Sequence, residues 1–299
     1  MDNIFLLKLI LAFLTGGTWV LIATIIADKF GSKIGGLIAG LPSTLLFSLL
    51  FIGWAQTPAI AVKAASIVPI IGGINTLFLV IFSSKIKRGL LISLIYAFAL
   101  WIILSFLAVI LRFHNFNVIL LGYVLMFSFS YYVFEFKLKI PSIAGKKIQY
   151  TRQQILLRGP LSGLIVSLSV LFGKIGGPTI GGMFGMFPAM FTSTLIITYL
   201  THGPQFSSAI AKSSMISSIS IVVYAVAVRH SYNSLGLVYG TVLATLVSFF
   251  LWIFNIQVRY QKSTLSKKFR NLRSLVLMTI AEQTQNRARK KIHLYTSEV

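Results

Sequence analysis

The sequence contains no cysteine and only five acidic residues in 299. Without cysteine the chain has no disulfide, no thiolate metal site and no cysteine nucleophile. Its 27 Lys and Arg residues against 5 Asp and Glu give a formal net charge of +22. Charged residues make up only 11% of the chain and apolar residues 56%, whereas soluble domains have roughly 25% charged residues. This composition predicts an integral membrane protein.

Sequence motifs of enzymes are also missing. The chain has no Walker loop, nucleophile elbow, paired acids or metalloprotease motif, and its four histidines lack metal-ligand spacing: His114, His202, His230 and His293. We therefore expect no enzyme activity, no cofactor and no metal. An intramembrane Ser–Lys arrangement remains an alternative, because serines are frequent in the apolar stretches.

Nine apolar stretches are long enough to cross a membrane, which takes about 20 residues. They are Phe5–Ala27, Ile34–Trp54, Ala59–Ser83, Leu90–Leu111, Val118–Glu135, Ile155–Phe172, Pro178–Leu200, Ser207–Val228 and Leu235–Ile256. The one long internal break, residues 136–154, is basic and follows the fifth stretch. The predicted fold class is an all-α integral membrane protein with about nine transmembrane helices.

Basic residues are concentrated in alternate loops, which indicates the orientation because Lys and Arg are retained in the cytoplasm. One set of loops holds only Arg112, Lys174 and Arg229, and the other set, with the tail, holds most of the remaining cations. We expect the N-terminus outside and the C-terminus inside a bacterial inner membrane. The same distribution makes anionic membrane lipids the expected partners and disfavours nucleic acid.

The sequence repeats itself. The segment that leads from Lys33 to Pro42 resembles the one that leads to Pro188, and each next helix opens with a proline, Pro58 or Pro204. Both proline pairs are 146 residues apart (188 − 42 and 204 − 58). We predict membrane repeat 1 over 1–113, a linker helix and basic loop over 114–154, membrane repeat 2 over 155–257 and a basic cytoplasmic tail over 258–299.

An odd number of helices between two copies turns the second copy over in the membrane. The predicted copies have four helices each, and the linker helix Val118–Glu135 lies between them. We therefore expect two inverted repeats, an arrangement found in transporters whose substrate path lies at the repeat interface.

The chain resembles a known family at the basic residue of the first helix, the Gly-rich approach to a proline in the second, and the cation in the small-residue third helix. These features are similar to those of GlpM and related small four-helix inner-membrane proteins. The resemblance implies two fused copies of such a protein. Because the role of that family is not settled, it implies architecture and no particular activity.

Glycine and proline recur at matching positions of the two copies, and we name them as broken-helix gates. Glycine permits close helix packing, and proline frees a carbonyl group that needs another partner in the membrane. The alternatives are a tight, kinked helix crossing or a discontinuous pore-lining helix in each half. The residues are Gly35, Gly36, Gly40 and Pro42 in copy one, and Gly181, Gly182, Gly185 and Pro188 in copy two.

Four cations lie within the apolar stretches: Lys8, Lys63, Arg158 and Lys212. Cations are costly in a membrane and are candidates for substrate binding, although long basic side chains also extend to lipid phosphates. We expect a transporter that moves a small anionic solute or a phosphorylated lipid by alternating access. Few acidic residues disfavour strong coupling to protons or sodium. The alternative function is a non-transporting scaffold of an envelope-polymer or lipid-synthesis complex.

Overall fold

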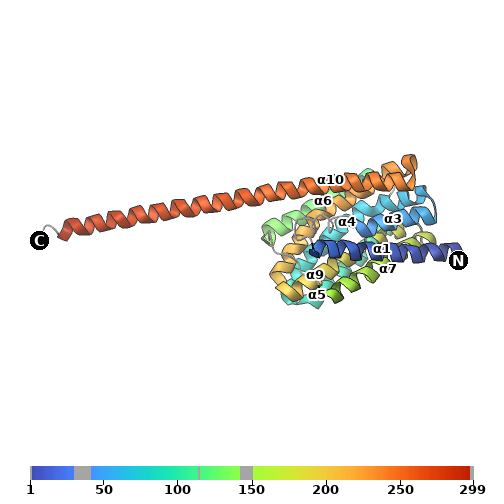
Figure 1. Ribbon diagram of the computed structural model, residues 1–299, viewed down its shortest axis with the longest axis horizontal. Coiled ribbons are helices and arrows are strands. Elements are labelled where there is room, and N and C mark those ends of the chain that lie inside the picture. Colours follow the sequence, from blue (N-terminus) through green and yellow to red (C-terminus); the bar gives the residue numbers. More distant parts are fainter. Residues whose placement is uncertain (1, 30–41, 114, 142–150, 297–299) are drawn as a thin grey trace. The chain divides into compact units, whose positions relative to one another are not determined.

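The structure, a computed structural model, describes residues 2–29, 42–113, 115–141 and 151–296. Side chains are described for these residues apart from 26–29, 252 and 254–296. The chain divides into two compact units, Met1–Trp252 and Ile253–Val299. In the first unit the helices pack side by side in a bundle (Figure 1), and the described part of the second is a helix.

All regular structure in the described residues is helical. The helices are α1 (Asn3–Lys29), α3 (Ser43–Ala55), α4 (Pro58–Lys85), α5 (Leu90–Ile110), α6 (Phe116–Tyr132), α7 (Arg152–Ile175), α8 (Pro178–Gly185), α9 (Ala189–His202) and α10 (Pro204–Thr296). A 3₁₀ turn (Ile86–Arg88) follows α4, and a π-helical turn (Val133–Lys137) continues α6. Local sequence explains several ends: Thr57 caps α4 ahead of Pro58, and Thr151 with Gln154 forms a capping box on α7.

Seven helical segments in the described part of the chain are long and apolar enough to cross a membrane, with α8 and α9 counted together as Pro178–His202 and the hairpin Pro204–Leu251 counted once; α3 is a shorter apolar helix. The prediction of an all-helical membrane protein is confirmed at this level. The count of nine stays a prediction, because residues 30–41, which belong to the second predicted stretch, lie outside the described residues.

Helix α10 turns back on itself at Gly236, whose φ of 73° and ψ of −177° are outside the helical region. Beyond the turn, Ser248 Oγ donates a hydrogen bond to the carbonyl of Ser220 at 2.8 Å, so the two segments form an antiparallel hairpin. Gly89, with φ 107° and ψ 160°, separates α4 from α5 in the same way. Glycine suits both turns because a side chain is strained at positive φ.

The first helices of the two predicted copies, α1 and α7, pack tightly against each other. A Cβ at Gly163 would overlap the carbonyl oxygen of Phe13, and Ser167 Oγ donates to the carbonyl of Leu9 at 3.2 Å. Residue numbers rise along α1 as they fall along α7. The two helices are therefore antiparallel, and glycine permits their close approach.

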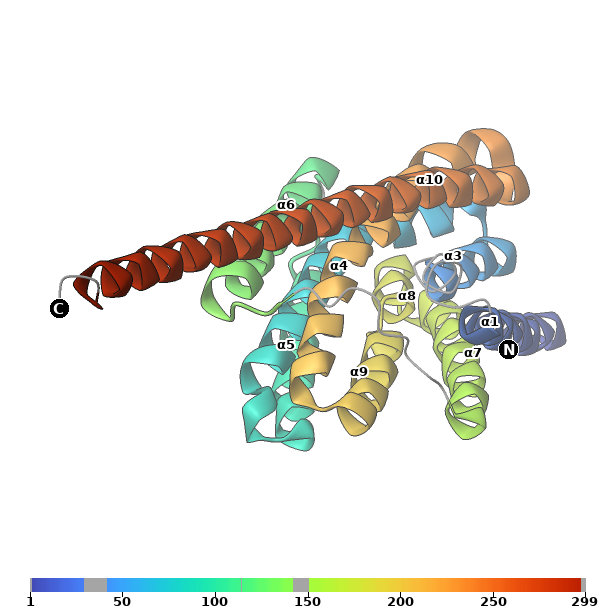
Figure 2. The ribbon, with the colours of Figure 1, turned by 60° about the vertical axis from the view of Figure 1, so that its left-hand side comes forward.

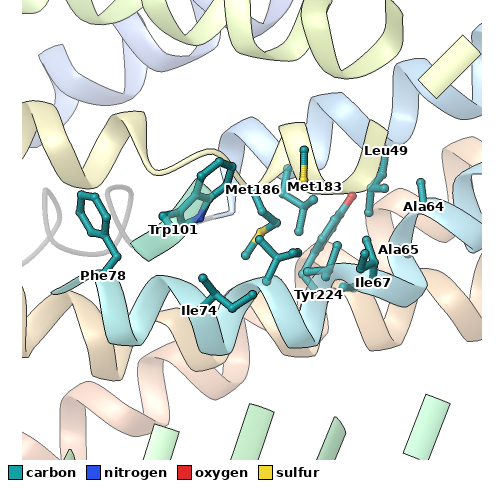
Figure 3. Packing of buried hydrophobic residues seen from close by; sticks show 14 of the residues in the cluster. Leu49, Ala64, Ala65, Ile67, Ile74, Phe78, Trp101, Met183, Met186 and Tyr224 are labelled. Atoms are coloured by element: carbon teal, nitrogen blue, oxygen red, sulfur yellow. The ribbon is translucent and has the colours of Figure 1, made fainter. Parts of the chain in front are cut away.

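The third helices of the two copies, α4 and the first segment of α10, are antiparallel as well. A Cβ at Gly72 would lie 2.9 Å from Val222 Cγ2, and Arg229 Nη1 donates to Ser66 Oγ. Helix α4 also packs against α5, α6 and α8, and most of its residues from Ala64 to Ser83 are buried. It is the central helix of the bundle core (Figure 3).

Candidate functional site

In the second predicted copy, the predicted membrane stretch Pro178–Leu200 forms two helices with a break between them in the core. Helix α8 ends at Gly185 and α9 begins at Ala189, with Pro188 at φ −78° and ψ 35° between them. Helix α8 packs between α7 and α4 (Figure 2), and α9, which follows it, contacts α7 and α5. Proline has no N–H group and cannot continue the hydrogen-bond ladder. Backbone groups at the break therefore need partners from other elements.

Copy one has the corresponding proline at the start of its own helix. Pro42, at φ −73° and ψ 50°, precedes α3 as Pro188 precedes α9. The predicted gate residues Gly35, Gly36 and Gly40 lie outside the described residues. Only the break in copy two can be followed on both of its sides.

The three glycines of α8 pack against different neighbours. A Cβ at Gly181 would lie 2.6 Å from Gly173 Cα in α7, and one at Gly182 would overlap the carbonyl oxygen of Ala64 in α4. At Gly185 a Cβ would lie 3.0 Å from a serine Cβ of α3. The segment thus combines a tight crossing with a discontinuous helix, and α8 has little room to move unless its neighbours move with it.

A buried asparagine from the other copy binds the backbone at the break. Asn75 of α4, which is 2% exposed, donates from Nδ2 to the carbonyl oxygen of Met186 at 3.0 Å. Its Oδ1 accepts a bond from Trp101 Nε1 of α5 at 2.7 Å. Trp101 lies beside Met186 in the core (Figure 3). Because the amide N–H and the amide oxygen of Asn75 are both hydrogen-bonded, and unpaired polar groups are costly in the core, these bonds hold the break in one conformation.

Aromatic rings surround this junction. Phe187, within the break, stacks on Phe98 with centroids 5.7 Å apart and meets the Trp101 ring edge-on at 5.2 Å. Neither Asn75 nor Trp101 was among the residues that we predicted. The available signal was the only amide side chain of the stretch Ala59–Ser83, since an amide is unusual in a membrane helix.

Lys212 of α10 is 6% exposed and forms an ion pair with Glu135, at 2.6 Å from Nζ to Oε2. Its Nζ also donates to the carbonyl of Ile140 at 2.7 Å. Glu135 lies in the π-helical turn that ends the linker helix. Glu135 was not among the site residues that we predicted, and its pairing with Lys212 comes from the structure.

Lys63, the counterpart of Lys212, is exposed on α4 and has no hydrogen-bond or ion-pair partner among the described residues. Because Ser66 contacts Arg229, Lys63 lies near the end of the first segment of α10, before the turn at Gly236. Lys212 lies 17 residues, about 26 Å, before Arg229 along that helix. We call these two ends of the bundle the Lys63 end and the Lys212 end.

The first-helix cations follow the same division. Lys8 donates to the carbonyl of Trp54 at 2.8 Å and lies 5.2 Å from its ring centroid, at the Lys63 end. Arg158 is buried, and its Nη1 donates to Thr194 Oγ1 at 3.1 Å. Because α1 and α7 are antiparallel, Arg158 near the start of α7 lies at the opposite end of the bundle from Lys8 near the start of α1. The structure therefore places two predicted cations at each end and does not gather all four in one cluster.

Comparison with known proteins gives one family. A family model described as "Protein of unknown function (DUF3147)" matches residues 9–114 and again residues 155–264. The two matches are consistent with a domain present in two copies, and together they cover most of the chain. No curated protein and no solved structure matches the chain.

Proposed function

Because the chain belongs to the DUF3147 family, whose function is unknown, we propose its function from the site. It is a transporter of the inner membrane that moves a small anionic solute or a phosphorylated lipid by alternating access. The observation that carries this function is the bond from Asn75 to the broken helix. In this view each half corresponds to one GlpM-like unit, and the halves are inverted repeats within a bundle of nine spans.

Reciprocal contacts between α1 and α7 support the inversion. A Cβ at Gly17 would lie 2.9 Å from the carbonyl oxygen of Gly159, while Ser167 donates to the carbonyl of Leu9. Shifted by the 150 residues that separate Lys8 from Arg158, Gly17 becomes Ser167 and Leu9 becomes Gly159. Such an exchange of partners is typical of a two-fold axis. Because the two helices are antiparallel, that axis is perpendicular to them.

The broken helix supports transport because interrupted helices at a repeat interface commonly form transporter binding sites. Here the interruption belongs to copy two and its hydrogen-bond partner, Asn75, belongs to copy one. A relative movement of the two halves must change this contact. The carbonyl of Met186 and the amide of Asn75 are then available to a polar substrate in the closed core.

The Lys212–Glu135 pair supports an anionic substrate. A lysine ammonium group has three donors, and Glu135 and Ile140 use two of them. An anion that enters at the Lys212 end competes with the Glu135 carboxylate for this cation. When the anion displaces Glu135, the end of the linker helix is released, so that anion binding is coupled to opening of the bundle at the Lys212 end. At the Lys63 end, Lys63 attracts anions.

Transport is tested with purified protein in liposomes and three probes: inorganic phosphate, glycerol 3-phosphate and a fluorescent phosphatidylglycerol. We expect flux of at least one probe above that of empty liposomes. The double variant Lys63→Gln/Lys212→Gln should lower it at least tenfold, because charge compensation is lost at both ends. The charge-matched control Lys87→Gln/Arg88→Gln, in the exposed turn after α4, should keep it.

Two results would contradict the proposed function. One is the absence of flux for all three probes in liposomes that contain folded protein. The other is equal flux in the Lys63/Lys212 variant and its control, which would remove these cations from the mechanism. The first result would favour the scaffold of an envelope-polymer or lipid-synthesis complex, a role that needs no path across the membrane.

A further inference from the structure

We propose that the Lys63 end carries a binding site for a phosphate group, centred on Arg229. The structure has an open pocket there, lined by Asn115, Phe116, Asn117, Arg229 and His230. None of these five residues is acidic, and their polar groups are a guanidinium, an imidazole and two amides. This set provides several hydrogen-bond donors and a positive charge, as recognition of a phosphate requires.

Arg229 is held in place without using up its donors. Its guanidinium lies 4.4 Å from the centroid of the Phe116 ring, and Nη1 donates to Ser66 Oγ of α4. A guanidinium has five N–H donors in one plane. Stacking on a ring occupies the face of that plane and leaves its edge open, so the remaining donors can bind two oxygens of one phosphate.

The other pocket residues are arranged to bind the same ligand. Nδ1 of His230 lies 2.8 Å from the carbonyl of Val226, so Nδ1 is the donor there. Nε2 of the neutral ring is then an acceptor, which can bind the P–OH hydrogen of a protonated phosphate oxygen. Asn115 caps α6 by accepting a bond from the N–H of Asn117 at 2.9 Å. The first N–H groups of α6 therefore lie at the pocket, and a helix N-terminus favours anions.

Further cations raise the positive potential around the pocket. Lys63 is one helical turn from Ser66, which accepts the bond from Arg229, and is therefore on the same face of α4. Arg112, exposed and three residues before Asn115, lies at the end of α5. A phosphate from solution and the headgroup of an anionic lipid both fit this chemistry, and the experiment must distinguish them.

The site is tested by binding, which does not depend on transport. The full chain is titrated with inorganic phosphate by calorimetry in a neutral detergent, and with phosphatidic acid in phosphatidylcholine nanodiscs by native mass spectrometry. We expect at least one of the two to bind. Arg229→Gln should weaken that binding at least tenfold, whereas Arg88→Gln, an exposed cation at the Lys212 end, should leave it unchanged.

His230→Gln keeps the Arg229–Ser66 bond and serves as a second variant if Arg229→Gln does not fold. It should weaken binding severalfold. Binding of inorganic phosphate identifies a soluble ligand, and binding of phosphatidic acid alone identifies a lipid headgroup; either result supports the site. Binding of neither probe, equal binding in wild type and both variants, or equal affinity for acetate would overturn it.

Discussion

Asn75→Leu is expected to abolish transport and to destabilise the protein. The leucine is close in size to asparagine but leaves the Met186 carbonyl and Trp101 Nε1 without their partner. Each unpaired buried group costs about 1–3 kcal/mol, so for the two groups we expect a loss of about 2–6 kcal/mol in the free energy of unfolding. Thermal unfolding in detergent and probe flux in liposomes measure the two effects.

The control for Asn75 is its neighbour Thr76. Thr76 Oγ1 is buried and hydrogen-bonds with Ser130 Oγ at 2.8 Å, away from the break. Thr76→Val also removes a buried hydrogen bond from α4, and it should lower stability while flux persists. Equal flux in Asn75→Leu and wild type would show that the contact with the broken helix has no part in transport.

Gly163→Ala is expected to push α1 and α7 apart. The added methyl group meets the Phe13 backbone, which cannot turn aside as a side chain can. Overpacking of this kind costs about 1–3 kcal/mol, so we expect a melting temperature lower by about 5–10 °C. Probe flux should fall too, because α1 and α7 belong to different copies and this contact joins them.

Gly122→Ala in α6 is the matched control. Its new methyl group would meet only the end of the Ile70 side chain, which can change rotamer. We expect a change of melting temperature of at most about 2 °C. An equal and small effect of both substitutions would contradict the close antiparallel packing of α1 and α7.

Most helix limits could be predicted from the sequence, because apolar length alone determines where a chain can cross a membrane. The stretch Ala59–Ser83 corresponds to α4 (Pro58–Lys85), and Leu90–Leu111 to α5 (Leu90–Ile110). The non-helical backbone before Pro188 lies where glycine and proline indicated an interruption. These features follow from the local chemistry of the chain.

The partners of polar groups could not be predicted. Lys212 and Glu135 are 77 residues apart, and their contact depends on how the linker helix ends in a π-helical turn. Asn75 and Met186 are 111 residues apart and come from different copies. Periodicity and composition show which residues are buried, but only the packing of the copies shows which buried groups meet.

The inversion of the two copies is tested most directly by cysteine labelling, since the chain has no cysteine of its own. Arg88 and Leu235 are both exposed and immediately precede the hairpin glycines Gly89 and Gly236. Single variants Arg88→Cys and Leu235→Cys are treated with a membrane-impermeant maleimide in intact and in opened cells. We predict that Leu235→Cys is labelled in intact cells and Arg88→Cys only after opening. Labelling of both from the same side would contradict inverted repeats.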